Sequence, residues 1–199
     1  MKLFYFFFIR ALIVFILSFV SFSQLRKHFF KKNRIKSKGA REFFLCIFAG
    51  YLAVLAVLLF TPNSYIANYG IDLTNEHFDF VGNFKDRIDA GNWGVNLVPF
   101  RTIKSYIKYS GFFHSLTNIF GNILIFVPLG ILLPILYKNY KRITKLLIHA
   151  ILLSLFIESI QFFIGRSVDI DDLILNSLGA LVGYFIYKNL PANIKNLSL

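Results

Sequence analysis

The chain has 199 residues, of which 56% are hydrophobic and 25 are Phe. Soluble domains average roughly 45–50% apolar residues, so this composition excludes an ordinary soluble protein and indicates an integral membrane protein. The formal net charge is +12, but the basic residues stand beside the hydrophobic runs. This placement is typical of membrane topology signals, and we expect no nucleic-acid partner.

Five hydrophobic runs approach the length of about 20 residues that crosses a bilayer. They are Leu3–Leu25, Phe43–Phe60, Asn118–Tyr137, Leu146–Ile164 and Leu173–Tyr187. The sequence therefore predicts an all-α fold, a polytopic transmembrane helix bundle of about five spans.

Lys and Arg are distributed unequally between the two sides that five spans create. Residues 26–41, residues 138–145 and the tail after Tyr187 hold eight, four and two of them, and the opposite side holds about seven. Since these residues concentrate on the cytoplasmic side, we expect the N-terminus and the loops after the second and fourth spans to face outward. The first run also resembles a signal peptide, but its cleavage would export the basic loop, so we expect a retained span.

Residues 61–117 form the one long connection, and their five acids and five bases balance. Near its end, the stretch GNWGVNLVPF (residues 91–100) is typical of a segment at the membrane surface, where Trp rings prefer to lie. A surface loop without a ligand and a lid over a site both remain open.

The fourth run carries a polar stripe, formed by Ser154, Glu158, Gln161 and Gly165. Steps of four, three and four residues place these positions on one helical face. Glu158 lies about 10 Å along the helix from the outer end, where a charged carboxylate costs about 2.5–3.5 kcal/mol. We therefore expect Glu158 to be protonated, paired or in contact with water.

The fifth run repeats the arrangement with Asp169, Asp172, Asn176, Gly179 and Gly183. Asp172 also suits an N-terminal cap or a favourable charge in the first helical turn. Gly179 and Gly183 form a small-xxx-small pair, which indicates close helix packing.

The third run has Asn118 and Asn122 one turn apart at its outer end, with Pro128 and Gly130 deeper. Pro128 should kink the helix and free a carbonyl that neighbouring groups must satisfy. By the predicted topology, the polar groups of all three runs lie in the outer half of the membrane, which favours one shared site.

These motifs resemble a known family. The runs NLVPF (96–100), NIFGNILIFVPLGILLP (118–134) and ESIQFFIGRSVDIDDLILNSLGALVG (158–183) together are similar to the VanZ-like family of bacterial membrane proteins. The resemblance covers about residues 45–187 and rests on Asn122, Phe126, Pro128, Gly130, Glu158, Gln161, Gly165, Arg166, Asp169, Asp172, Asn176 and Gly179. It implies a multi-pass protein of the bacterial plasma membrane and a link to teicoplanin resistance, with which the family's named member is associated. The distribution of Lys and Arg predicts that the motif loop is extracytoplasmic.

The chain is expected to divide into three parts. Residues 1–42 form an N-terminal transmembrane helix and a basic cytoplasmic loop, which are additional to the family pattern. Residues 43–190 form the VanZ-like transmembrane domain with its outward-facing loop 61–117, and residues 191–199 form a cytoplasmic tail.

The first functional hypothesis is a polar intramembrane pocket that binds a membrane lipid, a lipid-linked cell-wall precursor or a lipoglycopeptide. Glu158 and Asp169 accept hydrogen bonds from the ligand, and Arg166 holds an anionic head group. The remaining polar groups expected to line the pocket are Asn118, Asn122, Gln161, Asp172 and Asn176.

The second hypothesis is an enzyme acting on a phosphate- or sugar-bearing lipid. Glu158, Asp169 and Asp172 are its candidate acid, base or cation ligands. The sequence has no nucleophile elbow, phosphate loop or His-rich metal pattern, and Cys46 is the one cysteine. We therefore favour a binding protein with no metal and no cofactor.

In the third hypothesis, the stripes hold the bundle together or recruit another membrane protein. Interhelical polar contacts contribute only about 0.6 kcal/mol on average, a weak reason for so many at one depth. Asp171 lies off the stripe of the fifth run, and we expect it to be solvated.

Overall fold

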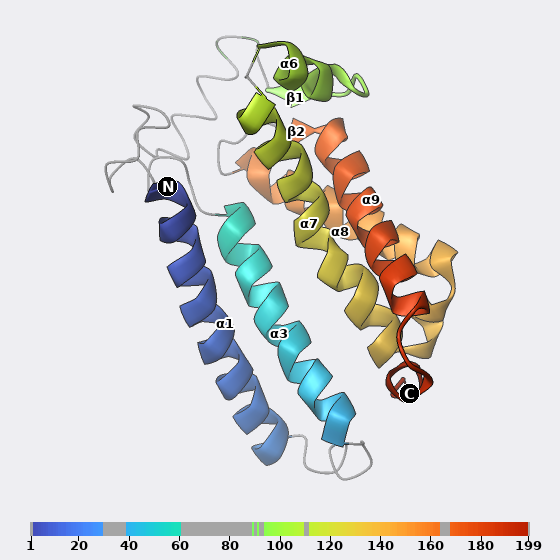
Figure 1. Cartoon of the computed structure of the whole chain (residues 1–199). Coiled ribbons are helices and arrows are strands. Elements are labelled where there is room, and N and C mark those ends of the chain that lie inside the picture. The colour runs from blue at the N-terminus through green and yellow to red at the C-terminus, as the bar shows by residue number, and fades with distance from the viewer. Residues whose placement is uncertain are drawn as a thin grey trace.

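The computed structural model describes residues 2–29, 39–60, 89, 91, 94–109, 112–163 and 168–198. Its long helices are α1 (Lys2–His28), α3 (Gly39–Phe60), α7 (Phe112–Leu136), α8 (Ile143–Phe163) and α9 (Ile170–Lys188). Each contains a stretch apolar and long enough to cross a membrane, and successive helices run in alternating directions (Figure 1). The predicted all-α bundle of five spans is confirmed.

All five long helices begin earlier than the hydrophobic runs predicted, by one residue in α1 and by three to six residues in the others. α9 starts at Ile170 instead of Leu173, because Asp169 is its N-cap and accepts a hydrogen bond from the Asp171 amide. α7 starts at Phe112, six residues before the expected Asn118. Capping and polar first turns extend a helix beyond its apolar stretch, so hydropathy alone places such starts too late.

Short elements close the two ends of the bundle. At one end, called here the α6 end, the strands β1 (Val95–Asn96) and β2 (Val168–Asp169) pair in parallel beside α6 (Arg101–Tyr109). At the other, called the η1 end, lie the short helices η1 (Lys138–Lys141) and α10 (Ala192–Lys195). Figure 1 shows that the N-terminus lies at the α6 end and the C-terminus at the η1 end.

The closest helix contact in the bundle joins α7 and α9. A methyl group added at Gly130 would lie 2.0 Å from the Ala180 carbonyl oxygen, and one at Gly183 would lie 2.1 Å from that of Val127. At Gly179 the corresponding distance, to the Ile123 oxygen, is also 2.1 Å. Glycine at these three positions therefore permits backbone-to-backbone contact, the packing role predicted for small residues between membrane helices.

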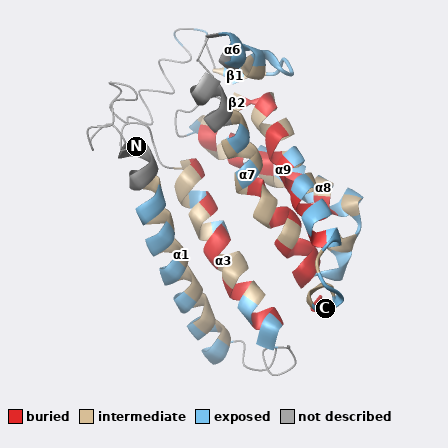
Figure 2. Cartoon of the chain, viewed as in Figure 1, coloured by how far each residue is buried: buried red, intermediate tan, exposed pale blue. Residues whose placement is uncertain are grey.

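The buried core follows this contact and extends to α3 and α8. Phe126, Leu146 and Ala180 are fully buried and belong to one cluster with Leu55 and Ile157. Figure 2 shows buried residues on α3, α7, α8 and α9, while the described part of α1 has only exposed and half-buried residues. Apolar side chains such as Leu17 and Phe156 are about 60% exposed, as expected for side chains that face lipid.

α7 contains the two prolines Pro128 and Pro134 and remains one helix from Phe112 to Leu136. The Tyr51 hydroxyl of α3 donates a hydrogen bond of 2.8 Å to the Ile125 carbonyl, three residues before Pro128. The Ile125 carbonyl is next to the Leu124 carbonyl. In an uninterrupted helix the Leu124 carbonyl would accept a hydrogen bond from the amide of residue 128, and Pro128 has no such N–H. A side chain from a neighbouring helix thus supports α7 beside the proline, as membrane helices require.

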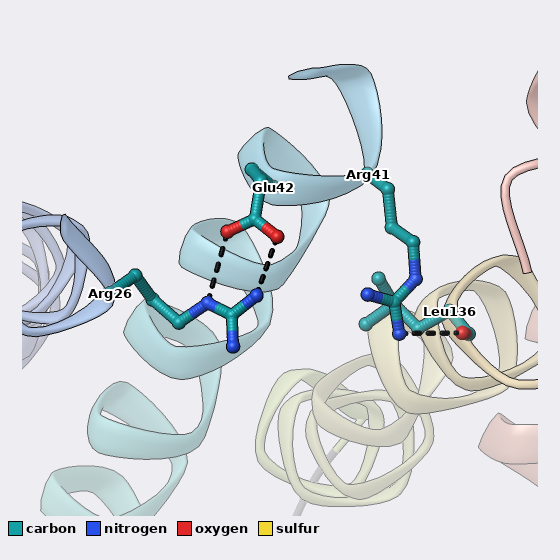
Figure 3. Close-up of polar contacts among 4 residues, drawn as sticks. All are labelled: Arg26, Arg41, Glu42 and Leu136. Atoms are coloured by element: carbon teal, nitrogen blue, oxygen red, sulfur yellow. Dashed lines mark hydrogen bonds and ion pairs between the residues drawn. The ribbon is translucent and has the colours of Figure 1, made fainter. Parts of the chain in front are cut away.

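Charged residues join the helices at the η1 end. Figure 3 shows the Arg26 guanidinium of α1 on both carboxylate oxygens of Glu42 in α3, with a distance of 2.9 Å from Nε to Oε2. Arg41 donates from Nη2 to the Leu136 carbonyl at the end of α7, at 3.4 Å, and its guanidinium lies 5.9 Å from the centre of the Tyr137 ring. α1 is therefore held to α3, and α3 to α7, at this end.

The C-terminal segment also packs against the bundle. Leu197 is buried in the core cluster, and Lys141 of η1 donates from Nζ to the Lys195 carbonyl at 2.9 Å. The expected tail, residues 191–199, is thus in contact with the transmembrane part as far as residue 198.

Candidate functional site

The β2 strand brings the predicted residues Glu158 and Asp169 together at the α6 end. Asp169 has extended backbone, with φ −135° and ψ 124°, and its amide donates to Glu158 Oε2 at 3.0 Å. Both side chains are buried, with 5% and 8% of their surfaces exposed. Glu158 was expected to be protonated, paired or in contact with water. In the structure its carboxylate accepts a hydrogen bond from the backbone amide of Asp169.

Asn96, in β1, connects this pair to the long connection. Its Nδ2 donates to Asp169 Oδ1 and to Thr102 Oγ1, both at 3.0 Å, and its Oδ1 accepts from the Val98 amide at 3.2 Å. The parallel pairing of β1 and β2 places Asn96 directly opposite Asp169. The NLVPF segment is therefore part of the acidic site, and its asparagine is the residue that contacts the carboxylate.

The prediction that Asp171 is solvated was wrong. Only 1% of its surface is exposed, and its carboxylate accepts hydrogen bonds from the backbone amides at the start of α6: Phe100, Thr102 at 2.9 Å and Ile103 at 3.1 Å. The physical reason is that the first amides of a helix have no partner within the helix and attract a negative charge. Asp171 lies off the stripe because it faces α6.

The acidic residues of the DIDD stretch therefore hold the starts of two helices. Asp169 caps α9, and Asp171 caps α6. Around these two carboxylates the described residues provide only amide donors, from Asn96 and from the backbone. We name Asn96, Glu158, Asp169 and Asp171 the acidic cluster.

The other predicted residues form separate pairs. Asn122 of α7 donates from Nδ2 to Asp172 Oδ1 of α9. Deeper in the bundle, Asn176 donates to Ser154 Oγ at 2.9 Å. Gln161 donates to the Leu59 carbonyl at 3.2 Å.

These pairs join helices as interhelical hydrogen bonds. Asp172 lies in the first turn of α9, where its charge is favourable, and Asp169 takes the capping position that the sequence offered to Asp172. Asn176 is 3% exposed, and its Oδ1 accepts no hydrogen bond within the described part of the chain.

Some predicted residues cannot be placed in the site. Arg166 and Gly165 lie outside the described residues, as does Trp93. Asn118 is in α7, but its side chain is outside the described part. No group of three or more His, Cys, Asp or Glu side chains that could hold a metal ion is found among the described residues.

The sequence interpretation missed α6 and the roles of Asn96, Thr102 and Asp171. Two signals pointed to them. Arg101, Ile103, Lys104, Ile107 and Lys108 follow the spacing of an amphipathic helix, and Asn96 begins one of the motifs on which the resemblance rests.

Comparisons with known proteins identify the family of this chain. The family model described as VanZ/LLP1 matches residues 48–192, most of the chain. A curated relative, Protein VanZ of Enterococcus faecium, is 33% identical over 106 residues, which cover 52% of this chain and 59% of that protein. The match thus spans less than two thirds of the relative's length. No solved structure matches the chain. The matched range contains α7, α8, α9 and the whole acidic cluster, and the chain belongs to the VanZ/LLP1 family of multi-pass membrane proteins.

Proposed function

We propose that this protein contributes to teicoplanin-type glycopeptide resistance by binding a lipid-linked cell-wall precursor or a lipoglycopeptide at the α6 end. The association with resistance comes from the family resemblance and from similarity to Protein VanZ. The excess of Lys and Arg in residues 26–41 and 138–145 supports placing the α6 end on the outer face of the plasma membrane. Such ligands are also exposed on that face.

The observation that carries the proposal is the convergence of carboxylates from α8 and α9 with the NLVPF segment. Glu158, Asp169 and Asp171 come together, and the donors around Asp169 and Asp171 are neutral amides. Burying a carboxylate has a cost unless it is hydrogen-bonded or paired. Acceptor oxygens concentrated in the buried layer at the α6 end suit a ligand rich in amide, hydroxyl or amine donors, as peptide and sugar head groups are.

A structural role of the same residues is the second candidate. It is favoured by the observation that most described polar side chains of the stripes bond to one another or to backbone, as Asn122 does to Asp172 and Gln161 to Leu59. In this case the cluster serves to join helices and recruits no ligand.

Isosteric substitution distinguishes the two candidates. Glu158→Gln and Asp169→Asn keep an acceptor oxygen for the hydrogen bonds seen here but remove the charge. We expect both variants to lose protection against teicoplanin in a susceptible Gram-positive host. Their membrane abundance and thermal unfolding midpoint in detergent should change little. Vancomycin, which lacks the lipid tail, serves as the comparison antibiotic.

Two further variants serve as controls. Glu42→Gln makes the same chemical change at the η1 end, where Glu42 pairs with Arg26, and should retain resistance. Gly179→Leu forces a side chain against the Ile123 carbonyl and should lose resistance together with folded protein. Full resistance in both Glu158→Gln and Asp169→Asn would refute the binding site, and resistance lost only in proportion to folded protein would favour the structural role.

A further inference from the structure

α6 is an amphipathic helix with an exposed apolar side. Ile107 is 68% exposed, and the segment just before the helix adds Leu97, Val98 and Phe100, each more than half exposed. Figure 2 shows that most of α6 is exposed. A soluble surface would leave these four side chains in water at a cost of roughly 25 cal/mol per Å² of apolar area.

The start of α6 is level with the end of a membrane span. Asp171, which binds the first α6 amides, is the second residue of the candidate span Ile170–Lys188. Asn96 is likewise paired with Asp169, the residue just before that span. Figure 1 shows α6 lying across the end of α7 and α9 rather than continuing either helix. These contacts place the start of α6 beside the end of that candidate span, and the ends of membrane spans lie where hydrocarbon gives way to head groups.

The exposed charges of α6 are all positive. Arg101, Lys104 and Lys108 are exposed, and the helix contains no acidic residue. Apolar residues at one side and bases at the other are typical of helices that lie in the membrane interface, where bases attract anionic lipids.

We propose that α6 is a membrane-interface helix that binds anionic phospholipid head groups. Leu97, Val98, Phe100 and Ile107 enter the acyl boundary, and Arg101, Lys104 and Lys108 contact the lipid phosphates. Asp171 ties this surface to the acidic cluster. The proposal does not depend on the function proposed above, because the surface lies outside the acidic cluster and its occupant is the surrounding bilayer.

The test uses the full chain in phosphatidylcholine nanodiscs. An environment-sensitive fluorophore is attached to Ile107→Cys in a Cys46→Ala background, and a small fraction of either brominated phosphatidylglycerol or brominated phosphatidylcholine is added as quencher. We expect quenching by both, with the phosphatidylglycerol enriched at the label by at least severalfold, since each base near an anionic surface contributes roughly fivefold. The same label on Asn139→Cys, which is exposed on η1, measures lipid quenching at the η1 end.

Charge removal provides the matched controls. Arg101→Gln, Lys104→Gln and Lys108→Gln together should abolish the phosphatidylglycerol preference at residue 107. Lys138→Gln, Arg142→Gln and Lys145→Gln remove equal charge from exposed positions at the η1 end and should leave that preference intact.

Three results would overturn the proposal, and none requires a variant that alters the fold. They are equal quenching by the two brominated lipids, quenching only by aqueous iodide, and energy transfer between labels on two chains, which would assign the surface to a second copy of the protein.

Discussion

Asp171→Asn tests the most unexpected contact in the molecule, the carboxylate that binds three amides at the start of α6. The asparagine oxygen can retain Thr102 and Ile103, which share Oδ2 in the native chain, but the new amide group then faces the Phe100 N–H. At least one charge-assisted hydrogen bond is lost, which contributes about 1.5–3 kcal/mol, together with the favourable charge at the helix start, about 0.3–1 kcal/mol. The expected loss is about 2–4 kcal/mol.

This loss should appear in α6 before it appears in the bundle. A helix of nine residues is shorter than the roughly 12–15 residues needed for marginal stability in isolation, so α6 depends on its contacts. Amide hydrogen exchange in detergent should accelerate for residues 100–109, by roughly 30-fold or more if local opening limits exchange. Exchange of α8 should change little.

Asp172→Asn is the matched control, because Asp172 is the next residue and accepts a hydrogen bond from Asn122 of α7. It should leave exchange in α6 unchanged. Equal acceleration by the two variants, or no acceleration by Asp171→Asn, would refute the assignment of Asp171 as the cap of α6.

Three further predictions concern packing, charge and topology. Gly183→Ala places a methyl group 2.1 Å from the Val127 oxygen and should cost about 1–3 kcal/mol of stability. Gly121→Ala, which meets nothing within 4 Å, should leave the thermal midpoint unchanged. Equal midpoints for the two variants would contradict the close α7–α9 contact. Asn96→Asp sets a carboxylate 3.0 Å from Asp169 Oδ1, and the repulsion between the two charges should lower the thermal midpoint at neutral pH. This loss should become smaller on acidification, and a loss that is independent of pH would argue against the contact. In a Cys46→Ala background, Ser105→Cys on α6 should react with an impermeant thiol reagent in intact cells and Asn139→Cys on η1 should resist it; the reverse pattern would place the acidic cluster on the cytoplasmic face.

The helices could be predicted from sequence because four apolar runs are long enough to span a bilayer by themselves, and the shorter fifth run, Leu173–Tyr187, lies within the observed span Ile170–Lys188. The packing glycines could be predicted for a related reason, since Gly179 and Gly183 recur on one helical face. The partners of individual side chains were harder to predict. Glu158 was expected to need a proton, a charge or water, and the structure gives it the amide of Asp169, which only the β2 turn brings within reach.

The remaining features depend on contacts between distant segments. Asn96 donates a hydrogen bond to Asp169, which lies 73 residues later in the sequence. No local sequence pattern specifies a parallel pair of two-residue strands. The burial of Asp171 follows from the arrival of α6 at that point. Periodicity within the fifth run describes only that helix and assigned Asp171 to solvent.

Native mass spectrometry of the protein purified in mild detergent tests the proposed binding at the acidic cluster most directly. The account predicts that a lipid-linked cell-wall precursor copurifies with the native chain and with Glu42→Gln, and that its occupancy falls at least tenfold in Glu158→Gln and Asp169→Asn at unchanged thermal stability. Equal precursor occupancy in all four proteins, or no precursor on any of them when it is supplied in excess, would contradict the proposed site.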